Sequence, residues 1–496
     1  MARMPEVNWL LDCDPRPAQI EALRRSYLGY RLKEHRDDAG EMRPLPWFGR
    51  PANGYGHFME MRTGKTPTAL NEFMLFKRDH GVNKMFVLAP NRFKPNWGLE
   101  AERFGIDAPI CVFHSGDRRE AEQFVRSNSE GVLVANYETL GYQKSMRIFD
   151  AWVDNKTFMV ADESVAMKNP QSWNFKNSML LSKQAAATRA LTGLPAPQGV
   201  TDLWAQLRFT RKLSSKNFYA FRARYAEMGG FKSRKVVGRK NTEELEGLLD
   251  EWTFRARLVD WADTLDSDYE LVETKMSDKQ QRAYDEMERD FMAWLDSGEM
   301  VSVENAVTKH MKLSQISSGF VYDGHGRAQE IAPFNKTPKF EDLKERLALI
   351  QNKTIIFAHH RHVVEQLYTH LGSYNPAIIA GGADMSRLGK NPVTEVNKFN
   401  NDPACRVMVG QSAAIKYGWT LMGNPNDPCL TSMFYENSYS LDTRAQCEAR
   451  NMGHGQVGPI HVLDYWTSPI EKEVVGALRD KKSVSDVIMG YYKRGP

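Results

Sequence analysis

The sequence has few cysteines and no long apolar run. Its five cysteines are an odd number and form no pairs at metal-binding spacing, so we expect reduced thiols rather than disulfides or zinc ligands. No stretch approaches the ~20 apolar residues of a membrane helix, and the first residues lack the apolar run of a signal peptide. We therefore expect a cytosolic protein that has no membrane partner.

An excess of charge of one sign is also lacking, because 66 Lys and Arg residues stand against 62 Asp and Glu residues. The net charge of +4 neither requires nor excludes nucleic acid, so any basic binding surface must be local. The 496 residues, of which 42% are hydrophobic and 26% charged, are enough for two or three globular domains.

The segment Phe58-Met-Glu-Met-Arg-Thr-Gly-Lys-Thr66 has the pattern of a phosphate-binding loop that leads into a helix at 67–77. Gly64 leaves room for backbone N–H donors around a phosphate, Lys65 supplies a cation, and Thr66 supplies a hydroxyl for Mg²⁺. Met59 stands where the full pattern has its first glycine. Taken alone, the segment is equally consistent with an ordinary strand–loop–helix start.

Short apolar runs alternate with helix-length segments, which predicts an α/β fold with parallel sheets. Buried strands are expected at 84–90, 110–114, 131–138, 157–163 and 189–193, and in the second half at 353–358, 377–382, 406–410, 431–435 and 460–465. Residues 15–19 open an amphipathic helix that we expect to run to about residue 32. Residues 33–56 are expected to form a connecting loop, and residues 205–330 to be helical.

Two carboxylates, Asp162 and Glu163, end one of these predicted strands. One carboxylate can hold Mg²⁺ while a second activates the water that attacks a phosphoryl group. Because the carboxyl ends of parallel strands share one edge of a sheet, loop 62–66, the acid pair and Thr192 should lie together. An acid pair after an apolar strand is common. It indicates a nucleotide site here only because the phosphate-loop pattern precedes it.

Two further features allow more than one interpretation. Gln19 could pair its amide with the edge of an adenine, or it could be an ordinary glutamine at a helix start. His359, His360 and His362 could suggest a metal site, but no carboxylate or cysteine is spaced to complete one. A loop at the end of a strand is the favoured interpretation of the histidines.

A series of short motifs follows one after another along the chain. They are Gln19, Arg62–Thr66, Ala89-Pro90 with Asn96-Trp97, Asn136–Glu138, Asp162–Ser164 with Lys168-Asn169, Leu191–Pro195 with Asp202–Trp204, Gly381-Gly382, and Gln446–Arg450 with Gln456. This series resembles the motor of superfamily-two helicases of the Swi/Snf type, and it is most similar to the compact members from bacteriophages and bacteria.

The resemblance implies two RecA-like lobes with helical protrusions between them. The N-terminal lobe would span 1–270 with a protrusion at about 205–265, and the C-terminal lobe 271–496 with a protrusion at about 277–330. ATP and Mg²⁺ would bind in the cleft, and duplex DNA would bind across both lobes. The resemblance further implies a monomer in the cytosol of a bacterium or a phage-infected host, with other replication or recombination proteins as possible partners.

The resemblance also assigns roles to individual residues. Nucleotide binding is implied for Arg16, Gln19, Arg62, Thr63, Gly64, Lys65, Thr66, Gly418 and Gln446, and a part in hydrolysis for Lys65, Asp162, Glu163 and Arg450. Thr66 and Asp162 would hold Mg²⁺, and Arg450 would act as an arginine finger. Nucleic-acid contacts are implied for Pro90, Asn96, Trp97, Asn136, Tyr137, Lys168, Asn169, Gly381, Gly382 and Ala414.

Four departures from the family pattern keep alternatives open. Gly453 stands where the family has a second arginine, Val165 replaces a histidine, Ile415 and Lys416 replace paired glycines, and Leu194 replaces a threonine. The favoured function is an ATP-driven translocase on duplex DNA, with weak or partner-dependent hydrolysis left open. The alternatives are a scaffold protein that binds nucleotide and DNA but hardly hydrolyses, and an RNA-directed helicase.

Overall fold

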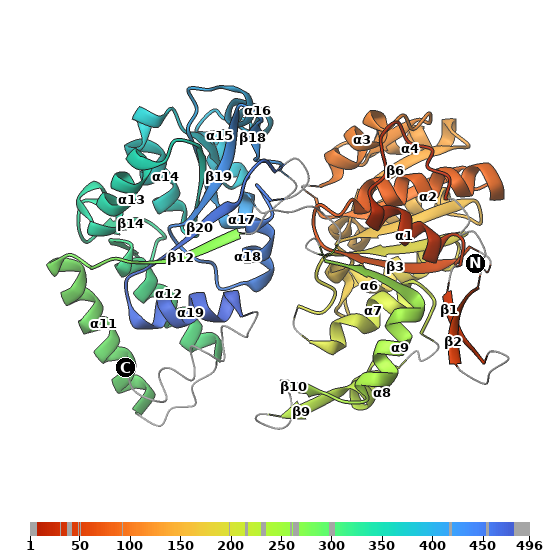
Figure 1. The fold of residues 1–496 in the computed structure, drawn as a ribbon, viewed down its shortest axis with the longest axis horizontal. Coiled ribbons are helices and arrows are strands. Elements are labelled where there is room, and N and C mark those ends of the chain that lie inside the picture. Colours follow the sequence, from red (N-terminus) through yellow and green to blue (C-terminus); the bar gives the residue numbers. More distant parts are fainter. Residues whose placement is uncertain are drawn as a thin grey trace. The chain divides into compact units, whose positions relative to one another are not determined.

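The structure is a computed structural model of the whole chain. It describes residues 7–29, 31–36, 42–47, 49, 51–91, 93–197, 199–213, 217–229, 235–257, 260, 267–296, 303–415, 419–452 and 456–480. The chain divides into two compact units, unit 1 at residues 1–263 and unit 2 at residues 264–496 (Figure 1). Each unit contains its own parallel sheet and its own cores, so each is described by itself.

The sheet of unit 1 has seven strands in the order β11-β3-β8-β7-β4-β6-β5, and all neighbours are parallel. The strands are β3 (Gly54–Met59), β4 (Lys84–Ala89), β5 (Ile110–Val112), β6 (Gly131–Asn136), β7 (Thr157–Asp162), β8 (Ala187–Leu191) and β11 (Thr253–Ala256). The helices are α1 (Pro17–Ser26), α2 (Lys65–His80), α3 (Lys94–Arg103), α4 (Arg118–Ser127), α5 (Gln143–Trp152), α6 (Trp173–Ser182), α7 (Leu203–Phe209), α8 (Phe218–Tyr225) and α9 (Thr242–Trp252).

Alternate residues of the strands face two separate cores. Met85 and Val87 of β4 pack with residues of α2 and α3, whereas Phe86 and Leu88 pack with residues of α5, α6 and α7 on the other face. A strand that is buried on both faces needs a continuous apolar run, which is why these strands can be predicted from composition. The polar groups of the sheet are consequently concentrated at the strand ends.

The sheet of unit 2 has the order β12-β20-β19-β15-β17-β16, with parallel neighbours, and β18 pairs antiparallel with β19. Its strands are β12 (Ser267–Glu273), β15 (Lys353–Ala358), β16 (Ala377–Ile379), β17 (Val407–Gln411), β18 (Gly423–Asn424), β19 (Asp427–Phe434) and β20 (Ile460–Trp466). Its helices are α11 (Asp278–Asp296), α12 (Val303–Ser317), α13 (Pro338–Leu349), α14 (Arg361–His370), α15 (Gly382–Arg387), α16 (Pro392–Asn401), α17 (Ser412–Ile415), α18 (Leu441–Glu448) and α19 (Pro469–Arg479).

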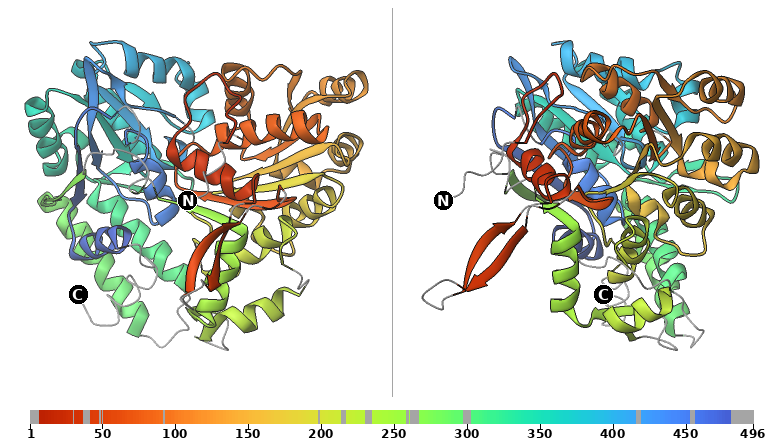
Figure 2. Two further views of the ribbon diagram at one scale, coloured as in Figure 1. Left: turned by 45° about the vertical axis from the view of Figure 1, so that its right-hand side comes forward. Right: turned by 90° about the vertical axis from the view of Figure 1, so that its right-hand side faces the viewer.

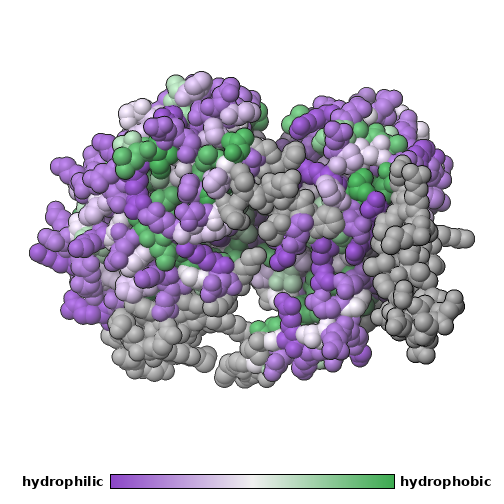
Figure 3. Space-filling model, viewed as in Figure 1, coloured by the Kyte–Doolittle hydropathy of each residue, from purple (hydrophilic) through white to green (hydrophobic). Residues whose placement is uncertain are grey.

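Three antiparallel hairpins lie outside the two large sheets. β1 (Arg31–Arg36) and β2 (Met42–Trp47) form a separate antiparallel ribbon (Figure 2). β9 (Ala226–Gly229) pairs with β10 (Lys235–Arg239), and β13 (Phe320–Tyr322) pairs with β14 (Ala328–Glu330). On the face seen in Figure 3, hydrophilic side chains predominate among the described residues. Among those residues no helix is long and apolar enough to cross a membrane.

Several predictions of local structure were wrong. The expected loop at 33–56 contains β1, β2 and the start of β3, and α1 ends at Ser26 rather than near residue 32. The region 205–330 is not all helical, since it holds two hairpins, the edge strand β11, and β12 of the second sheet. β16 ends at Ile379 so that Gly382 starts α15, and the expected lobe boundary at 270 stays a prediction. The tail at 481–496 lies outside the described residues.

Two glycines of strand β3 lie where neighbouring atoms approach the strand closely. A Cβ on Gly54 would lie 1.7 Å from the carbonyl oxygen of Thr210, just after α7. A Cβ on Gly56 would lie 3.0 Å from Cγ2 of Thr253 in the adjacent strand β11. Glycine lowers the strand propensity of this segment, but it leaves room for the contacts of β3 with Thr210 and Thr253.

A fully buried ion pair connects β8 to α2 in unit 1. The Arg189 guanidinium donates to both carboxylate oxygens of Glu72, at 2.8 Å from Nε and 2.5 Å from Nη2. His57 of β3 lies 3.1 Å from the same carboxylate, and all three side chains are fully buried. Burial raises the pKa of Glu72, but the opposing effect of Arg189 and His57 is larger and brings the pKa down to about 2. The ion pair therefore holds the helix that follows the phosphate-binding loop against the sheet.

We predict that Glu72→Gln lowers the free energy of unfolding by about 3–5 kcal/mol, since it leaves a buried guanidinium without its counter-charge. Urea unfolding followed by circular dichroism measures the change. The control is Glu130→Gln, which breaks an exposed pair with Lys77 of the same helix and should cost under about 1 kcal/mol. Because the folded pKa of Glu72 lies below its usual value of 4.5, its stabilisation is present above pH 4.5 and is lost as the pH falls towards 2. Equal effects of the two variants would contradict the role of the buried pair.

Candidate nucleotide-binding site

The phosphate-loop segment of unit 1 joins the end of β3 to the start of α2. Gly64 is the last residue before the helix and has φ +93°, a conformation that side-chain-bearing residues rarely adopt. Lys65 Nζ donates to the carbonyl oxygens of Met59 and Glu60, at 2.9 and 3.4 Å. Thr63 Oγ1 also donates to Glu60 O, at 2.6 Å. The loop thus closes on itself around the lysine, at the N-terminus of a 16-residue helix.

The start of α1 braces this loop from the other side. Gln19 Nε2 donates to Gly64 O at 3.2 Å, and Gln19 Oε1 accepts a bond from Arg16 N at 2.6 Å. The Arg16 guanidinium donates to Arg62 O, and Arg62 itself has a φ of +63°. Gln19 is 3% exposed and uses both ends of its amide within the protein. In this structure it therefore supports the loop, and its predicted pairing with adenine stays a prediction.

The acid pair lies at the end of β7, which is separated from β3 by the single strand β8. Asp162 Oδ2 accepts a bond from Trp97 Nε1 at 2.9 Å, and Asp162 Oδ1 accepts one from Glu163 N at 3.0 Å. Burial raises the pKa of Asp162, while the Trp97 N–H, the Lys65 charge and the Glu163 N–H act in the opposite direction. Because the Lys65 charge acts on Asp162, the acid pair and the phosphate loop lie near each other.

Glu163 adopts a strained backbone conformation, with φ 45°. Its carboxylate accepts a hydrogen bond from Thr192 Oγ1 at 3.2 Å, and the same hydroxyl accepts one from Leu194 N at 3.2 Å. Thr192 follows β8, so this bond joins the ends of two neighbouring strands. The predicted meeting of the acid pair and Thr192 at one sheet edge is present in the structure.

Three of the residues assigned to nucleic-acid contact are buried. Trp97 and Tyr137 are 2% and 1% exposed, and Tyr137 donates its hydroxyl to Asp162 O at 2.8 Å. Ala414 in unit 2 is also 2% exposed. Their side chains pack within their own units, and contact of these three residues with DNA stays a prediction.

The other predicted contact residues vary in exposure. Asn136 is largely buried, accepts a bond from Lys94 Nζ at 2.9 Å and donates one to Glu138 at 2.6 Å. Asn169 is exposed, while Pro90, Asn96, Lys168 and Gly381 are half-buried. These residues are open to a ligand at least in part, and their contact with DNA stays a prediction. Gly382 begins α15, and its side-chain environment lies outside the described residues.

Sequence reasoning missed one carboxylate beside the phosphate loop. Glu100 of α3 accepts a hydrogen bond from the Thr66 side chain and lies close enough to Asp162 to feel its charge. Burial, together with the negative charge of Asp162, raises the pKa of Glu100 to about 7 despite the bond from Thr66. The sequence shows only that Trp97 and Glu100 are three residues apart and so share one face of a helix.

In unit 2 the predicted arginine finger lies in the interior. Arg450 is 4% exposed, and its guanidinium donates to Gln446 O at 2.7 Å and to Trp419 O at 3.1 Å. Gln446 donates to Asp442 Oδ1 at 2.8 Å. The predicted nucleotide contact Gly418, and the departures Lys416 and Gly453, lie outside the described residues.

The histidines after β15 belong to a carboxylate network. His360 Nδ1 lies 2.9 Å from Glu436 Oε1, and the backbone N–H groups of His359 and His360 donate to the other oxygen at 2.9 and 2.8 Å. Burial raises the pKa of Glu436, but His360 and the surrounding donors bring it down to about 2. No group of metal-ligating side chains occurs among residues with described positions.

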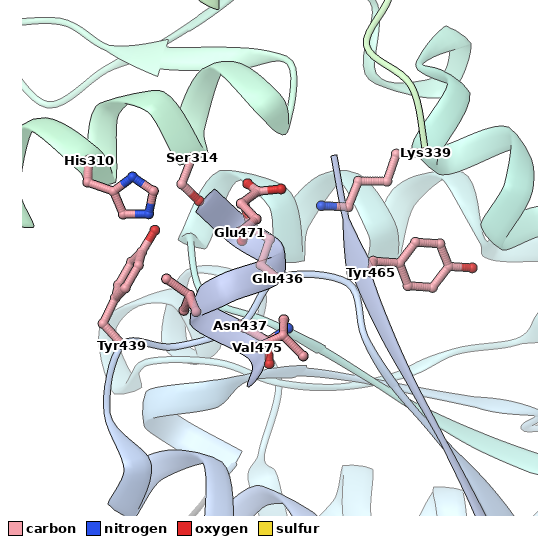
Figure 4. A pocket seen from close by; sticks show the side chains of 10 residues that line it. His310, Ser314, Lys339, Glu436, Asn437, Tyr439, Tyr465, Glu471 and Val475 are labelled. Carbon is pink, nitrogen blue, oxygen red and sulfur yellow. The ribbon is translucent and has the colours of Figure 1, made fainter. Parts of the chain in front are cut away.

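A small internal cavity of about 20 Å³ adjoins this network in unit 2 (Figure 4). His310 and Tyr439 line it with their rings in edge-to-face contact, the centroids 5.4 Å apart, and burial lowers the pKa of His310 to about 4. The volume suits about one water molecule. None of the residues predicted for nucleotide or nucleic acid lines it, so the candidate site remains at the sheet edge of unit 1.

A phosphate-type loop between a parallel strand and a helix, with an acid pair at the end of a nearby strand, defines the class of P-loop nucleotide-binding proteins. The sequence matches the SNF2-related domain over residues 7–329, more than half of the chain. The chain belongs to the SNF2-related family.

Among its relatives is the chromatin structure-remodeling complex subunit snf21 of Schizosaccharomyces pombe, 24% identical over 325 residues, covering 62% of this chain and 26% of the relative. Another is putative protein p41 of Acyrthosiphon pisum secondary endosymbiont phage 1, 24% identical over 288 residues, covering 54% of this chain and 59% of the relative. The chain thus spans less than two thirds of either protein. The Sulfolobus solfataricus SWI2/SNF2 ATPase core in complex with dsDNA is 18% identical, with 98% of both chains covered and a TM-score of 0.42.

We predict that Gly64→Ala lowers nucleotide affinity by about tenfold or more. The new Cβ would lie 2.3 Å from Gln19 Nε2, so the loop and its brace must move apart. The matched control is Gly81→Ala at the other end of α2, which also has a positive φ, +66°, but meets no atom within 4 Å. Both variants carry a backbone strain of about 1–2 kcal/mol, and only Gly64→Ala should weaken binding of a fluorescent nucleotide. Comparable losses in both variants would show that strain alone is responsible.

Proposed function

We propose that this chain is an ATP-driven motor that moves along, or remodels, duplex DNA. The observation that carries the proposal is the joint placement of a closed phosphate loop and an acid pair at one edge of the unit 1 sheet. Membership of the SNF2-related family supports the choice of a motor over other P-loop proteins.

The side chains in unit 1 fit a bound Mg²⁺. Thr66, Asp162 and Glu163 offer only oxygen donors, and Mg²⁺ is usually held by one or two carboxylates together with substrate phosphates and water. Thr66 and Asp162 are therefore the proposed ligands. When bound, the cation would neutralise charge that develops on the phosphoryl group.

The residues of the chain divide the remaining work. Lys65 would exchange its carbonyl partners for phosphate oxygens, which gives the ammonium a stronger, charged acceptor. Glu163, held by Thr192 in a fixed position, would accept a proton from the attacking water. Arg450 would supply positive charge to the phosphoryl group after giving up its bonds to backbone carbonyls.

Phosphate contacts would dominate binding of DNA, so we expect little sequence preference. A bacterial or phage-infected cytosol as the place of action, a monomeric state, and other replication or recombination proteins as partners stay predictions. The phage relative supports a phage-related origin.

We predict that the purified protein hydrolyses ATP and that duplex DNA stimulates turnover. Lys65→Ala should abolish turnover, whereas Lys77→Ala, at the far end of the same helix, should not. Arg450→Ala should cost about 10³-fold or more. Its control is Arg406→Ala, which likewise removes a guanidinium bonded to a backbone carbonyl, that of Ile350 at 2.8 Å.

A parent protein that binds ATP without turnover, and that gains turnover on Gly453→Arg, would support the scaffold alternative. Thermal melting of each variant should accompany the assay, because Arg450 is buried and its loss could weaken unit 2.

We predict that affinity for duplex DNA falls by about 10³-fold or more between about 50 and about 200 mM salt, as expected for six or more phosphate contacts. Lys168→Ala should reduce the slope of log affinity against log salt by about 1. Lys156→Ala is the control, because this exposed lysine precedes β7 and lies at the opposite edge of the sheet. An affinity that does not change with salt would rule out the phosphate-contact mechanism, and tighter binding of duplex RNA than DNA would favour the RNA helicase.

A further inference from the structure

Helix α3 directs three polar side chains towards the carboxyl edge of the unit 1 sheet. Lys94, Trp97 and Glu100 follow one another at intervals of three residues and so lie on one face of the helix. Lys94 Nζ donates to Asn136 at the end of β6, and Trp97 Nε1 donates to Asp162 at the end of β7. Glu100 accepts a bond from Thr66 in the first turn of α2. α3 therefore contacts both residues proposed to bind Mg²⁺.

The contact with Trp97 fixes the Asp162 carboxylate. The indole has one N–H donor, and it lies 2.9 Å from Asp162 Oδ2 in a residue that is only 2% exposed. Oδ1 is held independently by Glu163 N at 3.0 Å. Because each oxygen has a donor on the protein side, the carboxylate cannot rotate, and its remaining lone pairs keep a constant direction.

The contact with Glu100 fixes the Thr66 hydroxyl in a complementary way. A threonine hydroxyl has one proton and two lone pairs, so it can bind a cation only with its proton directed elsewhere. Glu100 accepts that proton. Oε2 of Glu100 is buried and has no hydrogen-bond partner among the residues that the structure describes. A buried carboxylate oxygen needs a donor, and a water bound to the cation would be one.

We propose that Trp97 and Glu100 are positioning residues for the metal-binding pair: Trp97 orients the Asp162 carboxylate, and Glu100 orients the Thr66 hydroxyl. This inference rests on the proposed function, because it concerns the same nucleotide site. It gives α3 a role in Mg²⁺-dependent nucleotide binding in addition to its packing against the sheet.

The test compares nucleotide binding with Mg²⁺ and with EDTA, using a fluorescent ATP analogue and the full chain. Trp97→Phe keeps an aromatic ring but removes the donor to Asp162. We expect its affinity in EDTA to match the parent, and its affinity gain from Mg²⁺ to fall about tenfold or more. The matched control is Trp152→Phe, which removes an equally buried indole donor, to Met85 O at 3.0 Å, on the other face of the sheet.

A second pair of variants tests Glu100 independently. Glu100→Gln keeps an oxygen that can accept the Thr66 proton but places an amide where the other oxygen stood. We expect it to lose about tenfold or more of the gain from Mg²⁺, whereas Glu102→Gln on the exposed face of α3 should behave as the parent. Combining Trp97→Phe with Asp162→Asn should add no further loss, since Trp97 acts through Asp162.

The outcomes separate this inference from the proposed function. If the parent binds nucleotide more tightly with Mg²⁺ and both Trp97→Phe and Glu100→Gln retain the full gain, the positioning role is wrong and the nucleotide site stands. Equal losses in EDTA and in Mg²⁺, shared by Trp152→Phe, would show a general loss of stability and also overturn the inference. A parent that binds no nucleotide under either condition would overturn the proposed function itself. Should Trp97→Phe fail to melt cooperatively, Glu100→Gln decides alone.

Discussion

The burial of the unit 1 sheet on both faces is the constraint on which the site depends. Helices cover both faces of β4, β6 and β7, so a charged side chain within these strands would lie in an apolar core. A fully buried ion pair, Arg189 of β8 with Glu72 of α2, is held by two hydrogen bonds between the two side chains. The polar residues of the candidate site lie at the strand ends, where the loop before α2, Asp162 and Thr192 meet. Because helices cover both faces of the sheet, a polar site can form only at its edge. The position of the site can therefore be predicted without assigning a role to any residue.

The same constraint explains why the surroundings of Asp162 matter as much as the carboxylate itself. Asp162 is 9% exposed, and burial alone favours its protonated, neutral form. The Trp97 N–H, the Lys65 ammonium and the Glu163 N–H oppose that tendency. A residue placed to bind a cation must keep its charge in the absence of the cation, and these groups supply part of the compensation. α3 is therefore more than a covering helix, since it carries a donor to one buried oxygen and an acceptor for the neighbouring hydroxyl.

The parts of the fold that could be predicted are those in which composition and burial agree. The continuous apolar runs at β4, β6, β7 and β15 correspond to strands buried on both faces, and the helix after Gly64 follows from its pattern. β3 was missed because Gly54 and Gly56 are required by the close approach of Thr210 and Thr253, a tertiary contact that leaves no local signal. The roles of Trp97 and Glu100 were missed for a related reason. Their spacing identifies a shared helix face, but only the fold shows that this face meets Asp162 and Thr66.

The departures from the family pattern take on a different meaning once their packing is considered. Ile415 replaces an expected glycine, and its side chain is fully buried in α17. It lies so close to β17 that a Cβ on Gly410 would be 2.2 Å from its Cδ1. The larger residue at the end of α17 is therefore matched by the absence of a side chain on Gly410 of β17. Leu194 likewise leaves the local hydrogen bonding intact, because its backbone N–H still donates to Thr192, which in turn donates to Glu163. Leu194 therefore leaves the contact between Thr192 and Glu163 at the unit 1 sheet edge intact, and Ile415 fits the space beside Gly410 in unit 2.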